Sequence, residues 1–222
     1  MIERTALITG ASRGIGKAIA ARLIEDGIKV IAPTHSEMDL ESNESIDQYL
    51  KNLPSFVDIL VNNAGINRID LFQNLSDEDL FDTIQVNLIA PMRLTRGIVQ
   101  GMIGQHFGRI VNISSIWSLV SKPGRSSYSV SKDGLNGFTR ALAVEVAPFN
   151  ILVNTVAPGF VNTDLTRQNN SPEEINEICK KIPLNRLAEP EEIARLVAFL
   201  CSDANSYVTG QCLVMDGGFT CM

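Results

Sequence analysis

The stretch that decides the fold is Thr5-Ala6-Leu7-Ile8-Thr9-Gly10-Ala11-Ser12-Arg13-Gly14-Ile15-Gly16. An apolar run of strand length leads into a turn with three glycines, and a helical pattern begins inside that turn. Backbone N–H groups and the positive helix end then face the turn, where glycines let a diphosphate approach because a Cβ would block it. The spacing is G-x-x-x-G-x-G rather than G-x-G-x-x-G, so an ordinary strand-to-helix turn stays open as the alternative at this point.

Apolar runs of strand length alternate with amphipathic helical stretches along the sequence, a pattern typical of βαβ units and a parallel sheet. The predicted strands are Thr5–Thr9, Lys29–Ala32, Ile59–Asn62, Arg109–Ile113, Leu152–Val156 and Cys212–Met215. The predicted helices are Gly14–Glu25, Glu44–Asn52, Asp77–Met102, Ser126–Val146, Pro172–Lys180 and Pro190–Cys201. We therefore predict an α/β fold in three layers, with helices on both faces of six parallel strands, in a single domain over residues 1–222.

The connection between the second and third predicted strands is short. About 26 residues separate them, whereas two successive parallel crossovers with an intervening strand need more. A single helix over Glu44–Asn52 is therefore expected in this region. A vestigial strand at Met38–Leu40 is the most that the length allows.

Composition narrows the class of partner. The formal net charge is −6 and the isoelectric point is about 5.0, so no cationic field favours nucleic acid or an anionic membrane. Four cysteines without CxxC spacing and only two histidines predict free thiols and no metal site. The sequence has no secretory signal pattern and no run of roughly 20 apolar residues. We expect a cytoplasmic protein that binds a small molecule, without membrane or nucleic-acid partners.

Further motifs follow the glycine turn in order along the chain. They are Asn62-Asn63-Ala64-Gly65, Asn87, Asn112-Ile113-Ser114-Ser115, Tyr128-x-x-x-Lys132, Pro158-Gly159 with Thr163, and Asp216-Gly217-Gly218. Together they resemble the short-chain dehydrogenase/reductase family over nearly the whole chain. The glycine turn and Pro183–Leu187 are most similar to 3-oxoacyl-carrier-protein reductases and related carbonyl reductases. The resemblance implies a Rossmann-type doubly wound sheet, NAD(H) or NADP(H), and a site at the carboxyl ends of the central strands.

Carbonyl reduction needs a hydride at carbon, a proton at oxygen, and donors where negative charge grows on that oxygen. Tyr128 is the candidate proton donor or acceptor. Lys132 lies one helical turn later on the same face, and its ammonium is expected to lower the pKa of the tyrosine. By resemblance, Lys132 also holds the nicotinamide ribose. Taken alone, the pair would more often be an ordinary surface i,i+4 contact, and only the other motifs favour the catalytic interpretation.

Two more residues complete the candidate catalytic set. Ser115 ends a strand thirteen residues before Tyr128, the spacing of the serine in the family, and its hydroxyl could donate to the substrate oxygen. Ser114 is the competing assignment. Asn87 lies inside a long predicted helix, and the resemblance implies that it distorts this helix and holds a water in a proton relay to Lys132.

The resemblance also supplies the expected cofactor contacts. They are Gly10, Ser12, Arg13, Gly14, Ile15, Gly16, Asp39, Leu40, Asn63, Ala64, Gly65, Tyr128, Lys132, Pro158, Gly159, Val161 and Thr163. Pro158, Gly159, Val161 and Thr163 are expected at the nicotinamide. Residues 164–185 are expected to close over the substrate as a mobile lid.

The choice between the two nicotinamide cofactors depends on the end of the second strand. An acid there would bind the ribose 2′-hydroxyl, but the sequence continues Ala32-Pro33-Thr34-His35-Ser36. Arg13 is suited to a 2′-phosphate through its planar donors. NADP(H) is therefore favoured, and NAD(H) stays open because the short connection could bring Glu37 or Asp39 to the ribose.

The sequence is compatible with three functions. The first is an oxidoreductase for a carbonyl or alcohol, with a 3-oxoacyl thioester or similar ketone as the substrate. The alternatives are a sugar-modifying enzyme of the same family and a cofactor-binding regulator without turnover. Similar proteins pair their two long helices, so the resemblance implies a homotetramer or homodimer.

Overall fold

The computed structural model describes residues 4–54 and 56–222. Its sheet has six parallel strands in the order β2-β1-β3-β4-β5-β6. The strands are β1 (Thr5–Ile8), β2 (Lys29–Ile31), β3 (Ile59–Asn62), β4 (Gly108–Ile113), β5 (Ile151–Pro158) and β6 (Cys212–Met215). The predicted doubly wound parallel sheet is confirmed, with strand ends that differ from the prediction by at most two residues.

Alternate side chains of the central strands pack on opposite faces of the sheet. In β1, Ala6 and Ile8 belong to one buried cluster, whereas Leu7 belongs to the other. In β3, Val61 joins the first cluster and Leu60 the second. Because successive side chains of a strand point to opposite faces, a strand that is apolar at every position must be covered on both sides.

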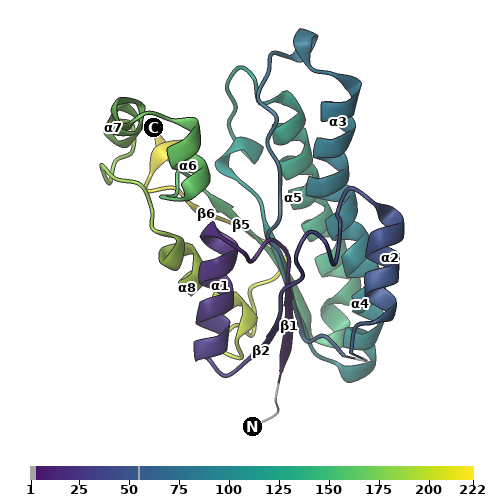
Figure 1. The fold of residues 1–222 in the computed structure, drawn as a ribbon. Coiled ribbons are helices and arrows are strands. Elements are labelled where there is room, and N and C mark those ends of the chain that lie inside the picture. The colour runs from purple at the N-terminus through teal and green to yellow at the C-terminus, as the bar shows by residue number, and fades with distance from the viewer. Residues whose placement is uncertain (1–3, 55) are drawn as a thin grey trace.

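Helices cover both faces, as Figure 1 shows. Helices α1 (Gly14–Glu25) and α8 (Pro190–Cys201) pack together over one face, and α2 (Asn43–Lys51), α4 (Ala90–Gln105) and α5 (Ser126–Val146) cover the other. Helices α3 (Asp77–Ile84), α6 (Asp164–Asn169) and α7 (Pro172–Lys180) lie beyond the upper end of the sheet in this view. In the part of the chain that the structure describes, no helix is both long and apolar enough to span a bilayer.

Two sequence predictions need correction. The single helix expected over Asp77–Met102 is divided into α3, a π-helical turn at Gln85–Ile89, and α4. The vestigial strand at Met38–Leu40 is absent, because these residues form turns and irregular backbone before α2. Helix α6 is an addition, since the sequence pattern predicted only α7 within the lid segment.

The strand order fixes the position of the site. From β1 the chain passes outward to β2 and then returns to the other side of β1 for β3, so the winding reverses between β1 and β3. In such sheets, ligands bind beyond the carboxyl ends of the strands at this reversal. The glycine turn and the loop after β3 both emerge there.

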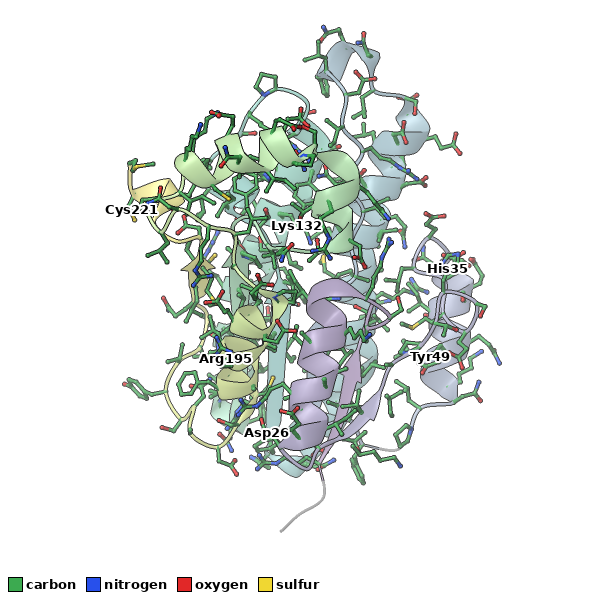
Figure 2. The ribbon with its side chains drawn as sticks, turned by 60° about the vertical axis from the view of Figure 1, so that its left-hand side comes forward. Asp26, His35, Tyr49, Lys132, Arg195 and Cys221 are labelled. Atoms are coloured by element: carbon green, nitrogen blue, oxygen red, sulfur yellow. The ribbon has the colours of Figure 1, made fainter. Side chains whose placement is uncertain are left out.

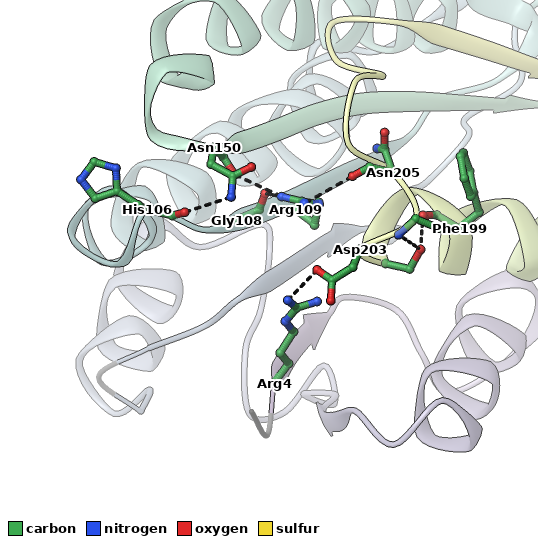
Figure 3. A network of polar contacts seen from close by, with 10 residues as sticks. Arg4, His106, Gly108, Arg109, Asn150, Phe199, Asp203 and Asn205 are labelled. Atoms are coloured by element: carbon green, nitrogen blue, oxygen red, sulfur yellow. Dashed lines mark hydrogen bonds and ion pairs between the residues drawn. The ribbon is translucent and has the colours of Figure 1, made fainter. Parts of the chain in front are cut away.

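The amino ends of the strands are closed by the polar network drawn in Figure 3. Arg109, at the start of β4, is almost fully buried, and its guanidinium donates to the carbonyls of Gly108, Asn150 and Asn205. Arg4 pairs with Asp203 nearby at 2.7 Å. This network ties three loops together at the end of the sheet opposite the glycine turn.

Candidate active site

A cleft of about 600 Å³ lies at the carboxyl end of the sheet. It is lined by the glycine turn, the segment after β2, the loop after β3 and the start of α6. The predicted cofactor residues in its lining are Gly10, Ser12, Arg13, Gly14, Ile15, Gly16, Asp39, Leu40, Asn63, Ala64, Gly65 and Thr163. Most of the cofactor residues predicted from the sequence therefore share one cavity.

The glycine turn has a backbone that side chains would not permit. Gly10 and Gly14 have φ angles of +66° and +55°, which glycine adopts without strain. A Cβ on Gly10 would lie 2.9 Å from the Cα of Ala64 in the loop after β3. The turn and this loop therefore approach each other backbone to backbone at the floor of the cleft.

Hydrogen bonds hold these two loops in place. The Thr9 hydroxyl accepts from the backbone N–H groups of Asn63 and Ala64, both at 3.0 Å. The Asn63 amide in turn donates to the carbonyls of Thr9 and Gly10. Thr9, the first residue of the glycine motif, therefore holds the two loops of the cleft together.

The N-terminus of α1 faces this cleft, and no side chain offsets the partial positive charge of that helix end. No side chain caps α1, and its first turn holds no acidic residue. By contrast, Ser76 caps α3, and Ser171 forms a capping box on α7. An uncapped helix N-terminus beside closely approaching backbone suits an anionic diphosphate, so these residues fit a dinucleotide cofactor.

The rim after β2 carries no free acid at the expected ribose position. Thr34 and His35 are exposed and line the cleft. The Glu37 carboxylate turns back to the backbone N–H and hydroxyl of Thr34, each at 2.8 Å. The Asp39 carboxylate accepts from the backbone of Glu41. Glu37 and Asp39 therefore have partners within their own loop, whereas Glu41 is a third acid that lines the cleft.

The candidate catalytic side chains meet where β4 ends and α5 begins. Ser115 is buried directly after β4, and Lys132 of α5 is only 3% exposed. The Lys132 ammonium lies 5.6 Å from the centre of the Tyr128 ring. Figure 2 labels Lys132 near the middle of the molecule, whereas His35 lies at its edge. Ser115, Tyr128 and Lys132 therefore gather in one place, as expected from the sequence.

The pKa values in this cluster are set mainly by burial. Burial raises the pKa of the Tyr128 hydroxyl, and the neighbouring Ser115 hydroxyl and Arg125 guanidinium only partly oppose it. Burial lowers the pKa of Lys132 to about 8. The lowered tyrosine pKa expected from Lys132 is not found, because burial of the phenol outweighs the neighbouring groups. The Lys132 ammonium donates to the Ile113 carbonyl at 2.8 Å.

Asn87 lies at the centre of the π-helical turn, and its amide is fully engaged. Its oxygen accepts from the backbone N–H of Ile66, and its nitrogen donates to the Ile66 carbonyl and the Ser131 hydroxyl. Gly65 fits closely beside it, since a Cβ there would lie 3.0 Å from the Asn87 amide oxygen and 3.3 Å from the Lys132 nitrogen. Asn87 thus joins the loop after β3 to α5.

The two neighbouring serines have different hydrogen-bond partners. The Ser114 hydroxyl donates to the Lys132 backbone carbonyl at 3.0 Å and is nearly inaccessible. The Ser115 hydroxyl accepts from the Trp117 backbone and faces the Tyr128 phenol. This geometry favours Ser115 over Ser114 as the residue near a substrate oxygen.

The residues expected at the nicotinamide surround the end of β5. Pro158 is the last residue of β5, and a Cβ on the following Gly159 would lie 2.8 Å from the Cα of Asp216. The Thr163 hydroxyl caps α6, and its methyl group lies beside Gly14 at the edge of the cleft. Pro158, Gly159 and Val161 do not line the 600 Å³ cleft, which stops short of Tyr128 and Lys132.

The amino-acid sequence of this chain is similar to those of known enzymes. The model of a family described as enoyl-(acyl carrier protein) reductase matches residues 32–220. The chain is similar to the 3-oxoacyl-[acyl-carrier-protein] reductase FabG of Aquifex aeolicus, with 42% identity over 241 residues that cover 97% of this chain and 96% of the relative. The chain belongs to the short-chain dehydrogenase/reductase family.

Solved structures agree with this membership. A putative gluconate dehydrogenase from Agrobacterium tumefaciens has a TM-score of 0.93 and 31% identity, covering 99% of this chain and 96% of that one. A putative NAD(P)-dependent gluconate 5-dehydrogenase from Beutenbergia cavernae, solved with bound NADP, has a TM-score of 0.92 and 36% identity, covering 99% and 97%. The protein is therefore an NAD(P)-dependent oxidoreductase that acts on a carbonyl or alcohol group.

The sequence reading did not anticipate every residue at this site. Thr34 and His35 line the cleft, whereas the sequence pattern indicated only that no acid stands at these positions. Arg125 lies near the Tyr128 phenol. Its position three residues before Tyr128 was a usable signal, because residues at that spacing share a helix face.

Proposed function

We propose that the protein reduces the ketone of a 3-oxoacyl thioester, or of a similar substrate, with NADPH. The observation that carries this proposal is the gathering of Ser115, Tyr128 and Lys132 beyond a cleft built for a dinucleotide. The substrate class follows the similarity to 3-oxoacyl-[acyl-carrier-protein] reductases.

The nicotinamide, when bound, supplies the hydride that forms the new C–H bond. The Tyr128 hydroxyl donates its proton to the carbonyl oxygen, on which negative charge grows. Its raised pKa keeps the phenol protonated at neutral pH, which suits the direction of reduction. The Ser115 hydroxyl donates a hydrogen bond to the same oxygen, and such a donor lowers the barrier by stabilising that charge.

Lys132 and Asn87 support this proton donor. We assign Lys132 to the nicotinamide ribose, since its ammonium lies beyond the inner end of the cleft next to Gly65. Asn87 is assigned to the proton relay behind Lys132. Residues 164–185 are assigned to a lid within the one domain of residues 1–222, because Asp164 at the start of α6 already lines the cleft.

Replacement of the proton donor tests this mechanism. Tyr128→Phe removes only the hydroxyl, so the rate of NADPH oxidation with a 3-oxoacyl thioester should fall by about 10²–10⁴-fold. Tyr207→Phe is the matched control, because Tyr207 is 95% exposed on a loop before β6, and it should keep the wild-type rate. Equal rates for Tyr128→Phe and wild type would exclude this chemistry and favour a regulator without turnover.

The preference for NADP(H) rests on charge at the rim of the cleft. Arg13 is exposed there, and of the three acids in the segment after β2, Glu37 and Asp39 are hydrogen-bonded within their loop. Arg13→Ala should weaken NADPH binding by about tenfold or more, since it removes a charge-assisted bond of about 1.5–3 kcal/mol. NADH binding should stay unchanged.

Titration of the reduced-cofactor fluorescence measures both affinities. Lys17→Ala is the control, because Lys17 is exposed on α1 outside the lining of the cleft. Equal loss of NADPH and NADH binding in Arg13→Ala would contradict a 2′-phosphate contact.

A second candidate function is the oxidation of a sugar acid. The two solved structures described above are named as gluconate dehydrogenases, and they cover this chain almost completely. This reaction would use the same residues in the opposite direction, with Tyr128 accepting the proton.

We also propose a cytoplasmic homotetramer or homodimer. Apolar side chains are exposed on the two long helices, namely Met92 on α4 and Val130 and Val144 on α5. Exposed apolar surface of this kind is typical of contacts between protein chains.

A further inference from the structure

Arg125, the residue before α5, has guanidinium nitrogens that lack a partner. Its Nε and Nη1 atoms are buried and make no hydrogen bond within the part of the chain that the structure describes. The guanidinium carbon lies 5.8 Å from the centre of the Trp117 ring. Since buried polar groups are almost always hydrogen-bonded, two donors in this position call for a partner from outside the chain.

These donors lie beside the reaction centre. Arg125 precedes Tyr128 by three residues, which places both side chains on neighbouring positions of one helix face. The guanidinium is close enough to the phenol to act on its pKa. A group held by Arg125 would therefore belong to the molecule whose oxygen Tyr128 protonates.

Lys122 lies against the same ring as Arg125, and Lys181 lies near Lys122. The Lys122 ammonium lies 5.5 Å from the centre of the same Trp117 ring. Burial lowers the pKa of Lys122 first, and the charges of Arg125 and Lys181 lower it further. Among the described residues, none of these three side chains has an ion pair. Glu177, which faces Lys181, is paired with Lys180 at 2.6 Å.

An aromatic wall of three half-buried rings stands on this side of the site. Trp117, Phe160 and Phe219 contact one another edge to face, with ring centres 5.4 to 6.4 Å apart. Charges interact more strongly beside such a wall than in open water, because the local dielectric constant is lower. The cationic group is therefore placed to hold an anion.

We infer that Arg125, with Lys122 beside it, is a subsite for an oxyanion carried by the substrate. The inference rests on the proposed function, because it assumes that a ketone binds at Tyr128. Two sources share this chemistry: a carboxylate on the ketone itself, or a phosphate on the carrier of a thioester. The planar guanidinium offers two parallel donors to either group.

Two pairs of ketones test the subsite and identify the source. Acetoacetate carries a carboxylate charge that ethyl acetoacetate lacks, and acetoacetyl-coenzyme A carries the phosphates, with the rest of the carrier, that S-acetoacetyl-N-acetylcysteamine lacks. Arg125→Gln should raise KM by about tenfold or more for the charged member of one pair and leave its neutral partner within about twofold. The pair whose charged member is affected identifies the source of the anion. Arg125→Lys, which keeps the positive charge, should restore part of the affinity.

Arg140→Gln is the control, since Arg140 is exposed on the same helix and its loss changes the net charge equally. Equal losses for charged and neutral members of both pairs would overturn the inference, because Arg125 would then act only through Tyr128 or the fold. A shift in the pH profile for neutral ketones would point to the same conclusion.

Failure of the proposed function is distinguishable from failure of the subsite. If the wild-type protein reduces none of the four ketones, the proposed function fails, but binding remains measurable. Trp117 is the single tryptophan, so its fluorescence reports directly on this position. Acetoacetate or phosphopantetheine should change the emission saturably in the wild type and not in Arg125→Gln, and identical titrations would overturn the subsite.

Discussion

At the scale of single residues, Lys132 is a buried cation beside Tyr128, and its burial lowers the stability of the fold. Its ammonium is 3% exposed, and in the described part of the chain it has a carbonyl partner and no carboxylate. Removing such a charge from water disfavours the charged form, which explains why the pKa falls to about 8. The folded protein thus holds an ammonium near Tyr128 at a cost in stability.

This cost is measurable as a pH dependence of stability. The pKa of Lys132 is about 8 when folded and about 10.4 when unfolded, so between these values the unfolded chain binds more protons. The free energy of unfolding should therefore rise with pH across that window, by up to about 3 kcal/mol, relative to Lys132→Met. Urea denaturation between pH 7 and 10.5 measures the difference, and a gap independent of pH would contradict the burial effect.

At the scale of elements, Pro91 weakens the helix between α3 and α4, but contacts with distant residues decide the form of the break. Pro91 has no N–H, so it cannot donate to the carbonyl of Asn87 four residues earlier, and its ring crowds that carbonyl. The Asn87 amide is held meanwhile by both backbone groups of Ile66. The chain widens to a π-helical turn at this point, as such turns often do at functional sites.

A substitution at Gly65 tests how closely the loop after β3 packs against this turn and α5. Gly65→Ala would press a methyl group on the Asn87 amide and the Lys132 ammonium, so we expect a loss of about 1–3 kcal/mol in stability and a lower rate. Gly104→Ala is the control, because a Cβ there meets nothing within 4 Å and alanine favours α4. Thermal melts and steady-state rates of both variants measure the effect, and an unchanged Gly65→Ala protein would refute the close packing.

At the scale of the whole molecule, the side of the sheet covered by α4 and α5 exposes apolar side chains. Figure 1 shows α4 and α5 together on the side opposite α1 and α8. Val144 on α5 is 79% exposed, and Val130 is 62% exposed on the same helix. A surface helix that carries such side chains is suited to pair with a second copy of the chain.

Charge placed on this surface should change the assembly. Val144→Glu is expected to lower the molar mass measured by light scattering after size-exclusion chromatography, because burying an unpaired carboxylate disfavours association. Ile24→Glu, on the exposed side of α1, is the control and should keep the wild-type mass. A Val144→Glu protein with the wild-type mass would rule out pairing through this part of α5.

The sequence by itself determined the parallel sheet, the glycine turn and the spacing of Tyr128 from Lys132, because periodicity, glycine conformation and helical spacing are local properties of the chain. Only the tertiary structure decided the π-helical turn at Asn87, the irregular path at Met38–Leu40, the raised pKa of Tyr128 and the open donors of Arg125. Each of these depends on burial or on hydrogen bonds between residues far apart in the chain, which no local pattern records.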